Sequence, residues 1–490
     1  MDKLKPFLEH YFGYTTFKDG QRQIIEAVIR GEDVFAMLAT GSGKSLCYQF
    51  PALWKNGTAI IVSPLLSLME NQVQELKQAG IRRAAAYNSF LSPPEKEYIL
   101  RHLNDYKIVY ISPESLQQPE FASRLQKLDV SLLAVDEAHC ISQWGHEFRT
   151  DYLRIKEIRR MAGNPPCIAL TATAAAEARK DIMEKLELTR PFIHCDSVDR
   201  PNIYIDVRKK KNEEEKRTTL QDECSRLPLP GMIYVSSRHK AEELAAFIRE
   251  ENGLKTSAYH GGMSNEDRRL VQQQFLNDEI DVICCTNAFG MGINKPNIRF
   301  VIHYHYSKDM ESFMQEIGRA GRDGRQSLSL VLFDTADGML PRRMIEHEFP
   351  SEEEVRMVSH DPERPDVVSS RFLLERYGLE EVHARFLQYY IQTWQKTKGA
   401  EPLDEFVSAV IERRMEWKLE KLKQKEHWLH QTVQCRRTTL LEVFDEHKTS
   451  TVSPCCDVCG EHTMHGQEQH RNTGQQALSW EERLKWILHQ

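Results

Sequence analysis

Short apolar runs alternate with helical stretches over the first 340 residues of this 490-residue chain, and this alternation limits its fold more than any other feature. The runs fall into two series of five, separated near residues 197–202 by a polar segment that contains a proline. Apolar runs of this length, joined by helical segments, are typical of βαβ units with parallel strands. The sequence therefore predicts an α/β fold with two tandem parallel sheets. The expected strands are 34–38, 58–63, 108–112, 132–135 and 167–170 in the first domain and 231–235, 256–259, 282–285, 301–303 and 329–333 in the second.

The pattern becomes helical after about residue 340. Residues 405–429 are rich in Glu, Lys, Arg, Met and Leu and predict one long helix. Its basic stretch 413–425 could contact nucleic acid, as could the lysine run 209–211, but a solvated surface is the favoured interpretation of both. We expect α/β domains at 1–197 and 198–340, a helical region at 341–430, a cysteine-rich module at 431–465 and a tail at 466–490.

Composition limits the possible partners and locations of the chain. No run of 18 or more apolar residues is present, so we expect no transmembrane helix and no membrane partner. The N-terminus lacks the apolar core of a signal peptide, and the expected location is cytoplasmic, with nucleoid association in a bacterium. Because the net charge is −7, any nucleic acid must bind a local basic groove. Seven of the 11 cysteines lie in apolar segments and are expected to be buried free thiols.

Residues 39–45 read Ala-Thr-Gly-Ser-Gly-Lys-Ser, between an expected strand and a helix expected at 46–53. This is the context of a phosphate-binding loop, where glycines let main-chain N–H groups approach phosphates beside a helix N-terminus. Lys44 would reach the β- and γ-phosphates of ATP, and Ser45 would coordinate Mg²⁺. The first glycine of the usual pattern is Leu38 here, and a chance Gly-Lys-Ser is the alternative. The loop residues expected to bind the nucleotide are Thr40, Gly41, Ser42, Gly43, Lys44 and Ser45.

Two carboxylates, Asp136 and Glu137, directly follow the expected strand 132–135. Acids at the tip of a buried strand can hold a nucleotide-bound Mg²⁺, so Asp136 is expected to bind the metal. Glu137 is the candidate general base that polarises the attacking water. The hydroxyls of Thr171 and Thr173, at the end of another strand, could relay between the γ-phosphate and the domain interface. A helix cap is the alternative for these threonines.

Residues 315–322 in the second domain read Gln-Glu-Ile-Gly-Arg-Ala-Gly-Arg. The two arginines, Arg319 and Arg322, are three residues apart and share one face of a helix or turn. If the domains face each other, both can reach the γ-phosphate as arginine fingers, which would link hydrolysis to domain closure. Gln315 is expected to join them in the ATP site. Two ordinary surface arginines are the alternative.

The loop 140–149 carries Trp144, His146, Phe148 and Arg149 a few residues beyond the two acids. Aromatic side chains can stack on nucleic-acid bases, which contributes about 1–3 kcal/mol per base without sequence preference. A motor that couples ATP hydrolysis to nucleic-acid movement needs acids and aromatics this close together. The alternative, that Trp144 and Phe148 are core residues, is outweighed by their position beside the acids.

With these motifs in this order, residues 8–340 resemble the RecQ family of superfamily 2 DNA helicases. The segments that carry the resemblance further are 11–21, 62–69, 110–114, 258–263 and 286–296. The resemblance implies two RecA-like domains with ATP between them. It also implies that Tyr14 stacks on adenine and that Gln21 bonds the adenine edge. Lys18 stands where this adenine-recognition motif usually has arginine, which predicts a weaker contact.

The resemblance also assigns roles around the DNA. The segments 62–69 and 110–114 look like the strand-contacting segments of the family, and the loop 140–149 looks like its aromatic-rich loop. In this resemblance, Trp144 and Phe148 sense single-stranded DNA. His146 and Arg149 help to signal to the ATP site.

The remaining four cysteines, which cluster near the C-terminus, resemble the RecQ zinc-binding module, where four cysteines hold a tetrahedral Zn²⁺. The pattern departs from the usual one near Ser453, where the module has a cysteine. Cys455 would then be the fourth ligand, with His447 and His462 as alternatives. The expected ligands are Cys435, on a helix, and Cys455, Cys456 and Cys459.

The expected role of the zinc is structural. It would stabilise the C-terminal lobe and present Arg436 and Arg437 near DNA. A degenerate module that is held together by packing alone is the alternative.

The resemblance implies an ATP-dependent DNA helicase that moves 3′-to-5′ and serves recombination, repair and replication-fork maintenance. We expect a monomer that acts on single-stranded and partial-duplex DNA. About thirty residues follow Cys459, too few for winged-helix and HRDC domains, so a short form is expected. The helical span before Cys435 is longer than expected for the family. The alternatives are a DNA-stimulated translocase without strand separation, an RNA helicase and a binding module with a decayed ATPase.

Overall fold

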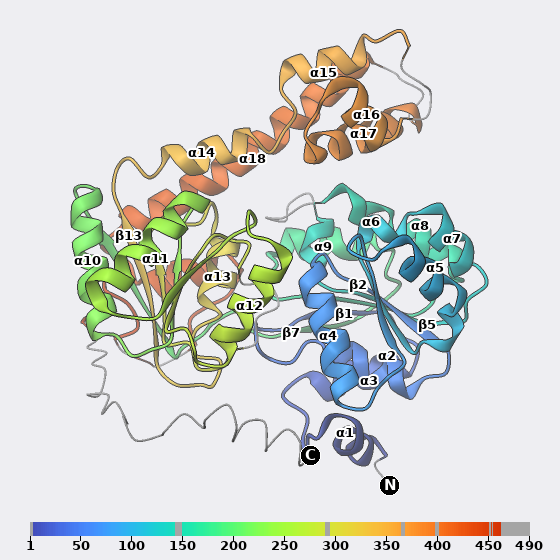
Figure 1. Ribbon diagram of the computed structural model, residues 1–490, viewed down its shortest axis with the longest axis horizontal. Helices are drawn as coiled ribbons and strands as arrows, with labels where there is room; N and C mark the ends of the chain where they lie inside the picture. Colours follow the sequence, from blue (N-terminus) through green and yellow to red (C-terminus); the bar gives the residue numbers. More distant parts are fainter. Residues whose placement is uncertain are drawn as a thin grey trace.

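The computed structural model describes residues 3–142, 149–289, 295–363, 368–396, 401–449, 452 and 454–461. Two parallel sheets flanked by helices lie side by side, and a helical arm extends from the second sheet over the first (Figure 1). Four cysteines gather near the end of the described chain. The predicted fold class, two tandem RecA-like α/β domains followed by a helical region and a cysteine module, is confirmed. The exact domain limits stay predictions.

The first lobe is built on a seven-stranded parallel sheet in the order β3-β4-β2-β5-β6-β1-β7. Its central strands carry only buried residues, because helices cover both faces of the sheet. All five strands predicted for this domain are present. The strands are β1 (Val34–Met37), β2 (Thr58–Val62), β3 (Ala84–Tyr87), β4 (Ile108–Ile111), β5 (Val130–Val135), β6 (Cys167–Thr171) and β7 (Phe192–Cys195).

Both edge strands of this sheet were missed from the sequence. β3 reads Ala-Ala-Ala-Tyr, and alanine is a weak strand former. β7 is only partly buried, and its last residue, Cys195, is an exposed thiol. The expectation that all seven scattered cysteines are buried is therefore wrong at Cys195. An edge strand has a neighbour on one side only, so its sequence needs no continuous apolar run.

The second lobe is built on a six-stranded parallel sheet in the order β10-β11-β9-β12-β13-β8. Its edge strand β8 was missed because the strand ends in the basic residues Arg208 and Lys209, which are partly or fully exposed. The polar link 197–202 lies between β7 of the first sheet and β8 of the second. The strands are β8 (Ile203–Lys209), β9 (Gly231–Tyr234), β10 (Thr256–Tyr259), β11 (Val282–Cys285), β12 (Phe300–His303) and β13 (Ser327–Phe333).

Helices cover both sheets. In the first lobe they are α1 (Leu4–Phe12), α2 (Gln21–Ile29), α3 (Leu46–Trp54), α4 (Leu66–Gln78), α5 (Pro93–Arg101), α6 (Pro113–Leu116), α7 (Pro119–Leu125), α8 (Ile155–Met161) and α9 (Ala176–Lys185). Three 3-10 turns add η1 (Leu103–Asp105), η2 (Ala138–Ile141) and η3 (Thr150–Arg154). The second lobe has α10 (Glu213–Arg226), α11 (Arg238–Asn252), α12 (Asn265–Leu276) and α13 (Met310–Ile317).

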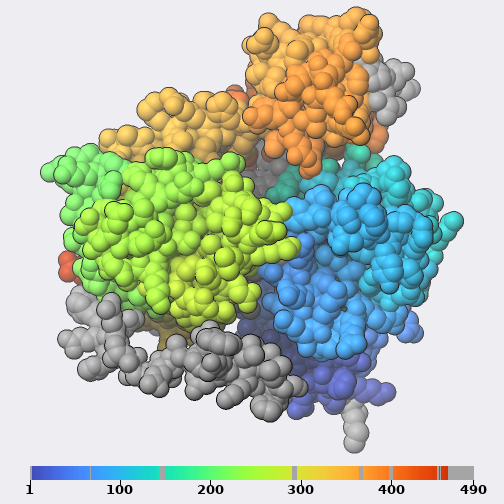
Figure 2. Space-filling model, in the orientation of Figure 1, coloured from blue at the N-terminus to red at the C-terminus, as the bar shows by residue number. Residues whose placement is uncertain are grey.

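The helical arm rises from the second lobe. Its longest helix, α18, has 28 residues and was predicted at 405–429. α14 runs beside α18, and α15, α16 and α17 form a knob at the far end, above the first lobe (Figure 1). Figure 2 shows the knob reaching across from one lobe to the other. The helices are α14 (Met339–Glu346), α15 (Glu352–Ser359), α16 (Ser370–Tyr377), α17 (Glu381–Lys396), α18 (Leu403–His430) and, beyond the arm, α19 (Arg436–Glu442).

One side of α18 buries basic residues. Arg414 and Lys425 are 7% and 0% exposed, so the solvated-face interpretation of 413–425 is wrong for this side. The Nζ of Lys425 lies 3.3 Å from the centroid of the Phe313 ring and 4.5 Å from that of Trp428. Burial lowers the pKa of Lys425 well below its usual value. Among the described helices, none combines the length and the apolar character needed to cross a membrane.

Candidate active site between the lobes and candidate metal centre

The segment 39–45 forms a tight loop between β1 and α3. Gly41 and Gly43 have φ of 85° and 84°, a left-handed conformation that side chains rarely adopt. Neighbouring atoms also leave no room for a side chain at either glycine. A Cβ on Gly41 would lie 2.8 Å from Cδ of Arg322, and one on Gly43 would lie 2.7 Å from Nε2 of Gln21. The loop therefore closely approaches groups from both lobes.

Two side chains before the loop hold its main chain in place. Nζ of Lys18 donates to the carbonyl oxygen of Gly41 at 3.1 Å. Nε2 of Gln21 donates to the carbonyl oxygens of Ser42 at 2.9 Å and Gly43 at 3.2 Å. The Oε1 of Gln21 accepts from the main-chain N–H of Lys18 at 2.9 Å. The start of α2 is thus tied to the loop. Tyr14, also expected at the adenine, is 59% exposed at the open end of the same cleft.

The two acids lie at the tip of β5, opposite the loop. Glu137 is a non-glycine residue with φ of 48°, a strained conformation of the kind that is often found at functional sites. Its Oε1 lies 3.7 Å from Nζ of Lys44. Burial, and next the charge of Glu137, raise the pKa of Asp136 to about 6. Two nearly buried carboxylates beside one lysine carry excess negative charge, so the donor set fits a divalent cation.

A buried network leads from Glu137 into the first lobe. Its Oε2 lies 3.4 Å from Nδ1 of His139, and the same ring nitrogen lies 3.1 Å from Oγ1 of Thr171. Oγ1 of Thr171 donates to the carbonyl oxygen of Thr173 at 3.0 Å. Thr171 therefore does not cap a helix, and it connects to the acid through His139. The relay role that the sequence suggests for it stays a prediction.

The two arginines of the second lobe follow α13. Nε of Arg319 donates to the hydroxyl of Tyr234 at 2.9 Å. Burial first, and then the charges of Arg319 and Arg200, lower the pKa of Arg322 to about 9. Three cations are thus concentrated at one end of α13, and an anion beside them would relieve their repulsion.

Arg200 was missed from the sequence, where it stands in the link between the sheets without a motif around it. Its guanidinium donates to three carbonyl oxygens of the segment that carries the arginine pair, those of Gly318 at 2.9 Å, Ala320 at 2.8 Å and Gly321 at 2.8 Å. These bonds hold the turn from which Arg319 and Arg322 project. Only the tertiary structure shows this role, because the bonded residues lie over a hundred positions further along the chain.

The loop, the two acids and the two arginines line one cleft of about 580 Å³ between the lobes. The cleft brings together residues that lie far apart in the sequence. Ser42 is the one predicted loop residue that is not among the lining residues, although its carbonyl oxygen accepts from Gln21. The predicted residues that line the cleft are Tyr14, Lys18, Gln21, Thr40, Gly41, Gly43, Lys44, Ser45, Asp136, Glu137, Gln315, Arg319 and Arg322.

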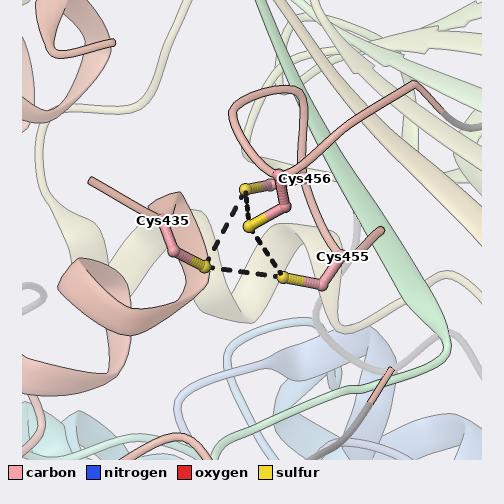
Figure 3. Close-up of side chains that lie close together, drawn as sticks. Cys435, Cys455 and Cys456 are labelled. Carbon is pink, nitrogen blue, oxygen red and sulfur yellow. Dashed lines mark hydrogen bonds between the residues drawn. The ribbon is translucent and has the colours of Figure 1, made fainter. Parts of the chain in front are cut away.

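The four cysteines form a compact cluster with all sulfur atoms within 4.8 Å of one another. Figure 3 shows Cys435 at the start of a helix and Cys455 and Cys456 on the facing loop, their sulfurs turned toward each other. The Sγ–Sγ distances are 3.5 Å for Cys435–Cys455 and Cys456–Cys459, 3.8 Å for Cys455–Cys459 and 3.9 Å for Cys456–Cys435.

Tetrahedral zinc with Zn–S bonds of about 2.3 Å separates its ligand sulfurs by about 3.8 Å. The observed spacings fit that geometry. His447 does not belong to the cluster, and His462 lies outside the described residues. Cys435 is the N-cap of α19 and lies just before the helix, where the sequence had placed it on one. Nζ of Lys448 lies 3.2 Å from Sγ of Cys455, which adds positive charge beside the thiols.

The cluster fastens the chain to the edge of the second sheet. The segment at Cys456 bridges to Ile205 of β8, and the main-chain N–H of Asp457 donates to the carbonyl oxygen of Ile205 at 3.0 Å. Nε of Arg436 donates to Asp457 at 2.6 Å. Arg437 bonds Asp199 and the carbonyl oxygen of Arg200.

Arg436 and Arg437 are each only 2% exposed. The expectation that they are presented to DNA is therefore wrong. They were misassigned because their partners, the carboxylates and carbonyl groups of the link and the cysteine loop, are distant in sequence.

Known sequence families match the chain in three parts. Residues 18–182 match the DEAD/DEAH box helicase family, 215–324 the helicase conserved C-terminal domain and 392–460 the RecQ zinc-binding family. The chain is 43% identical to the "Probable ATP-dependent DNA helicase RecS" of Bacillus subtilis (strain 168) over 495 residues. This alignment covers 100% of this chain and 98% of that protein. The chain belongs to the RecQ family of ATP-dependent DNA helicases.

A second relative, the ATP-dependent DNA helicase RecQ of Bacillus subtilis (strain 168), is 39% identical over 80% of this chain, which spans 64% of that protein's length. Among solved structures, Mss116p bound to single-stranded RNA and AMP-PNP has a TM-score of 0.57 at 17% identity, covering 83% of this chain and 94% of that one. This likeness shows the shared two-lobed fold. The helicase domains imply ATP use, and the zinc-binding match together with the four cysteines indicates zinc.

In this RecQ family member, most of the loop expected to sense DNA lies outside the described residues, namely Trp144, His146 and Phe148. Arg149 is described. Its main-chain N–H donates to the carbonyl oxygen of Cys140 at 2.9 Å, and its Nη1 donates to that of Pro64 at 3.3 Å. Arg149 also lines a second hollow, away from the nucleotide cleft, where the two lobes meet the helical arm.

Proposed function

We propose that this RecQ family member uses ATP hydrolysis in the cleft between its lobes to unwind duplex DNA with 3′-to-5′ polarity. The observation that supports this most is the make-up of the cleft. The first lobe supplies a glycine loop, Lys44 and two acids, and the second supplies two arginines. Neither lobe holds all of these groups, so ATP turnover depends on the relative placement of the two lobes. ATP turnover can therefore move one lobe relative to the other.

ATP binding is assigned as follows. Tyr14 stacks on the adenine and Gln21 bonds the adenine edge. Lys18 and Gln21 also donate to main-chain carbonyl groups of the phosphate loop. Residues 40–45 surround the phosphates, with Lys44 reaching the β- and γ-phosphates. Bound Mg²⁺ neutralises the charge of the phosphates and is held by Asp136 and Ser45.

Hydrolysis is assigned to groups from both lobes. Glu137 accepts a proton from the attacking water, and Lys44 and His139 hold its two carboxylate oxygens, at 3.7 and 3.4 Å. Arg319 and Arg322 stabilise the negative charge that develops on the γ-phosphate. Gln315 lines the same cleft at the end of α13 and contacts the nucleotide from the second lobe.

DNA coupling is assigned to the loop that follows the acids. Trp144 and Phe148 stack on bases of single-stranded DNA. His146 and Arg149 transmit the resulting change in loop conformation to the ATP site. Supporting this, Arg149 bonds the main chain of Cys140, three residues beyond Glu137. A shift of the loop can therefore reach the general base directly.

Zinc is assigned a structural role. Cys435, Cys455, Cys456 and Cys459 hold it, and the metal secures the cysteine loop along β8. One chain supplies every group of the nucleotide cleft, so we propose that a monomer is the working unit. Its substrates are single-stranded and partial-duplex DNA, and its place is the cytoplasm, at the nucleoid in a bacterium. The processes served are recombination, repair and maintenance of replication forks.

The test is unwinding of partial duplexes that carry either a 3′ or a 5′ single-stranded tail, with ATP and Mg²⁺. ATP hydrolysis with and without single-stranded DNA or RNA is measured in parallel. We expect unwinding from the 3′ tail alone and stimulation by DNA above that by RNA. Unwinding from the 5′ tail would refute the polarity. DNA-stimulated hydrolysis without unwinding would indicate a translocase, and stimulation by RNA alone would indicate an RNA helicase.

A further inference from the structure

The helical arm touches both lobes, although it is joined in sequence to the second one. α14 and α18 leave the second lobe together, and α17 at the far end contacts η3 of the first lobe. Nη1 of Arg385, on α17, lies 2.9 Å from a carboxylate oxygen of Glu114 and 3.6 Å from one of Asp151. A second link joins Lys396 to Glu157 at 3.3 Å. The arm therefore spans the gap between the lobes (Figure 2).

Beneath the arm, the three parts enclose a hollow of about 540 Å³. Glu114, Arg149 and Asp151 line it from the first lobe. Asn287 and Lys308 line it from the second lobe. The arm adds the remaining walls, which are lined by Glu348, Phe349, Val382, Arg385, Phe386, Arg414 and Lys418.

The hollow lies where extended ligands bind in folds of this kind. Glu114 belongs to α6, which follows β4 in the first sheet, and Asn287 follows β11 in the second. Ligands of open parallel sheets bind at the carboxyl ends of the strands. Arg149, the described end of the aromatic loop, lies in the same hollow. Both lobes therefore turn their ligand-binding edges toward the arm.

The lining is basic, in contrast to the chain as a whole with its net charge of −7. Five cations face three carboxylates. Lys308 and Lys418 share a single carboxylate, Glu348. The guanidinium of Arg414 lies over the ring of Phe349, 5.9 Å from its centroid. A local excess of positive charge that comes from three separate parts of the fold favours a polyanion that passes between them.

We propose that the helical arm forms a third wall of the DNA path, closing over a single strand with Lys308 and Lys418 facing its phosphates and Arg385 acting as the latch. This rests on the proposed DNA helicase function and adds to it a role for the arm. The apolar side chains of the wall, with Val382 61% exposed, offer a surface on which bases or sugars can lie. A closed path would keep the motor on its strand while the lobes move.

The phosphate contacts are tested by the salt dependence of binding to oligothymidylate. Each phosphate contact with single-stranded DNA contributes a slope of about −0.7 to the plot of log K against log salt concentration. We expect Lys418→Gln and Lys308→Gln each to reduce the slope by about that amount and to weaken binding by about three- to tenfold at low salt. The matched control is Lys423→Gln, on α18 of the arm but with a 64% exposed side chain outside the hollow. Thermal unfolding identifies any variant that fails to fold.

The latch is tested by the rate at which preformed complexes release the oligonucleotide. Arg385→Ala should raise the dissociation rate at least about fivefold, because the arm then loses its contact with Glu114 and Asp151. Arg371→Ala is the control, since Arg371 lies on α16 of the same knob, is 85% exposed and, within the described part of the chain, pairs with its own helix neighbour Glu375. Equal rates for the two variants would refute the latch.

The outcomes separate this inference from the function on which it rests. If the unmodified protein neither binds oligothymidylate nor hydrolyses ATP faster in its presence, the helicase function fails. If it does both, and Lys308→Gln and Lys418→Gln keep the unmodified slope, then the arm is not a wall of the DNA path and only the further inference fails.

Discussion

The two lobes share one architecture and bring opposite charges to the cleft between them. The first contributes Asp136 and Glu137, and burial, followed by the charge of Glu137, raises the pKa of Asp136 to about 6. The second contributes Arg319 and Arg322, and burial together with the neighbouring arginines lowers the pKa of Arg322 to about 9. Each lobe thus brings like charges close together in its part of the cleft, and their repulsion is unfavourable in the absence of a ligand. A ligand that carries a cation at one end and phosphates at the other relieves both, which makes the nucleotide the element that joins the lobes.

The largest effect is expected on the first-lobe side. Lys44→Ala should remove measurable ATP hydrolysis, a loss of about 10³-fold or more, and should also weaken nucleotide binding, because the proposed role of Lys44 is to hold the phosphates before and during the reaction. Steady-state hydrolysis and fluorescent nucleotide binding measure the two effects. Retained turnover would mean that the site is assigned to the wrong loop.

The second lobe should behave differently. Arg322→Ala is expected to lower turnover about 10³-fold and to change nucleotide affinity only a few-fold, since an arginine finger acts mainly on the transition state. Measuring kcat and the nucleotide Kd for the variant and the unmodified protein tests this expectation. A parallel loss of binding would show that the arginine holds the ground state and that the lobes do not divide the work as proposed.

The loop beyond the acids is proposed to couple the cleft to DNA, so a substitution in this loop should leave hydrolysis in the cleft intact. Trp144→Ala should preserve basal hydrolysis and reduce its stimulation by single-stranded DNA about tenfold, the value expected from one lost stacking contact. Hydrolysis is measured over a DNA titration. Unchanged stimulation would make Trp144 a core residue.

A smaller effect is expected at Arg200, which positions the second-lobe arginines through three carbonyl oxygens. Arg200→Ala should lower kcat about three- to tenfold and leave the nucleotide Kd unchanged, because it removes the support of the turn and displaces the two arginines without removing either of them. Arg200→Lys, which keeps one donor group, should recover part of the rate. A change in Kd without a change in kcat would contradict the positioning role.

The smallest effect on hydrolysis is expected at the cysteine cluster. The unmodified protein should contain about one zinc per chain. Cys456→Ser should lower the zinc content and the Tm by several degrees, because metal binding contributes to folding, while hydrolysis at 20 °C changes less than about twofold. Cys195→Ser, at the exposed cysteine of β7, is the control. A cluster without zinc and an unchanged Tm would show that packing alone holds the module.

The sequence predicts well those parts of the molecule that depend on neighbours in the chain. Contiguous residues predict the phosphate loop, the acids at the tip of β5 and the central strands. The nucleotide cleft could also be anticipated, because two local motifs in consecutive α/β domains imply that the domains meet.

Features that depend on distant partners could not be predicted. Arg200 stands in a polar link and gains its role only from the end of α13. Arg436 and Arg437 look like a surface pair, but their partners, which include Asp457 and Asp199, bury them. Lys425 fits the polar side of an isolated helix, yet the ring of Phe313 lies over it in the fold. In each case the positive charge interacts with the protein's own carbonyl groups, carboxylates or aromatic rings, which come from distant parts of the chain.

The length of α18 gives the arm a mechanical property. A helix of 28 residues is about 42 Å long, and its base is packed into the second lobe while its tip carries the knob over the first. A rotation of the second lobe by about 5° would carry the tip by about 4 Å. Added to the 2.9 Å that separates Arg385 from Glu114, that displacement would carry the two groups beyond ion-pair distance. If the proposed domain movement occurs, the arm would enlarge a small rotation at the nucleotide into a larger displacement at its tip, and the proposed latch would open and close with each cycle.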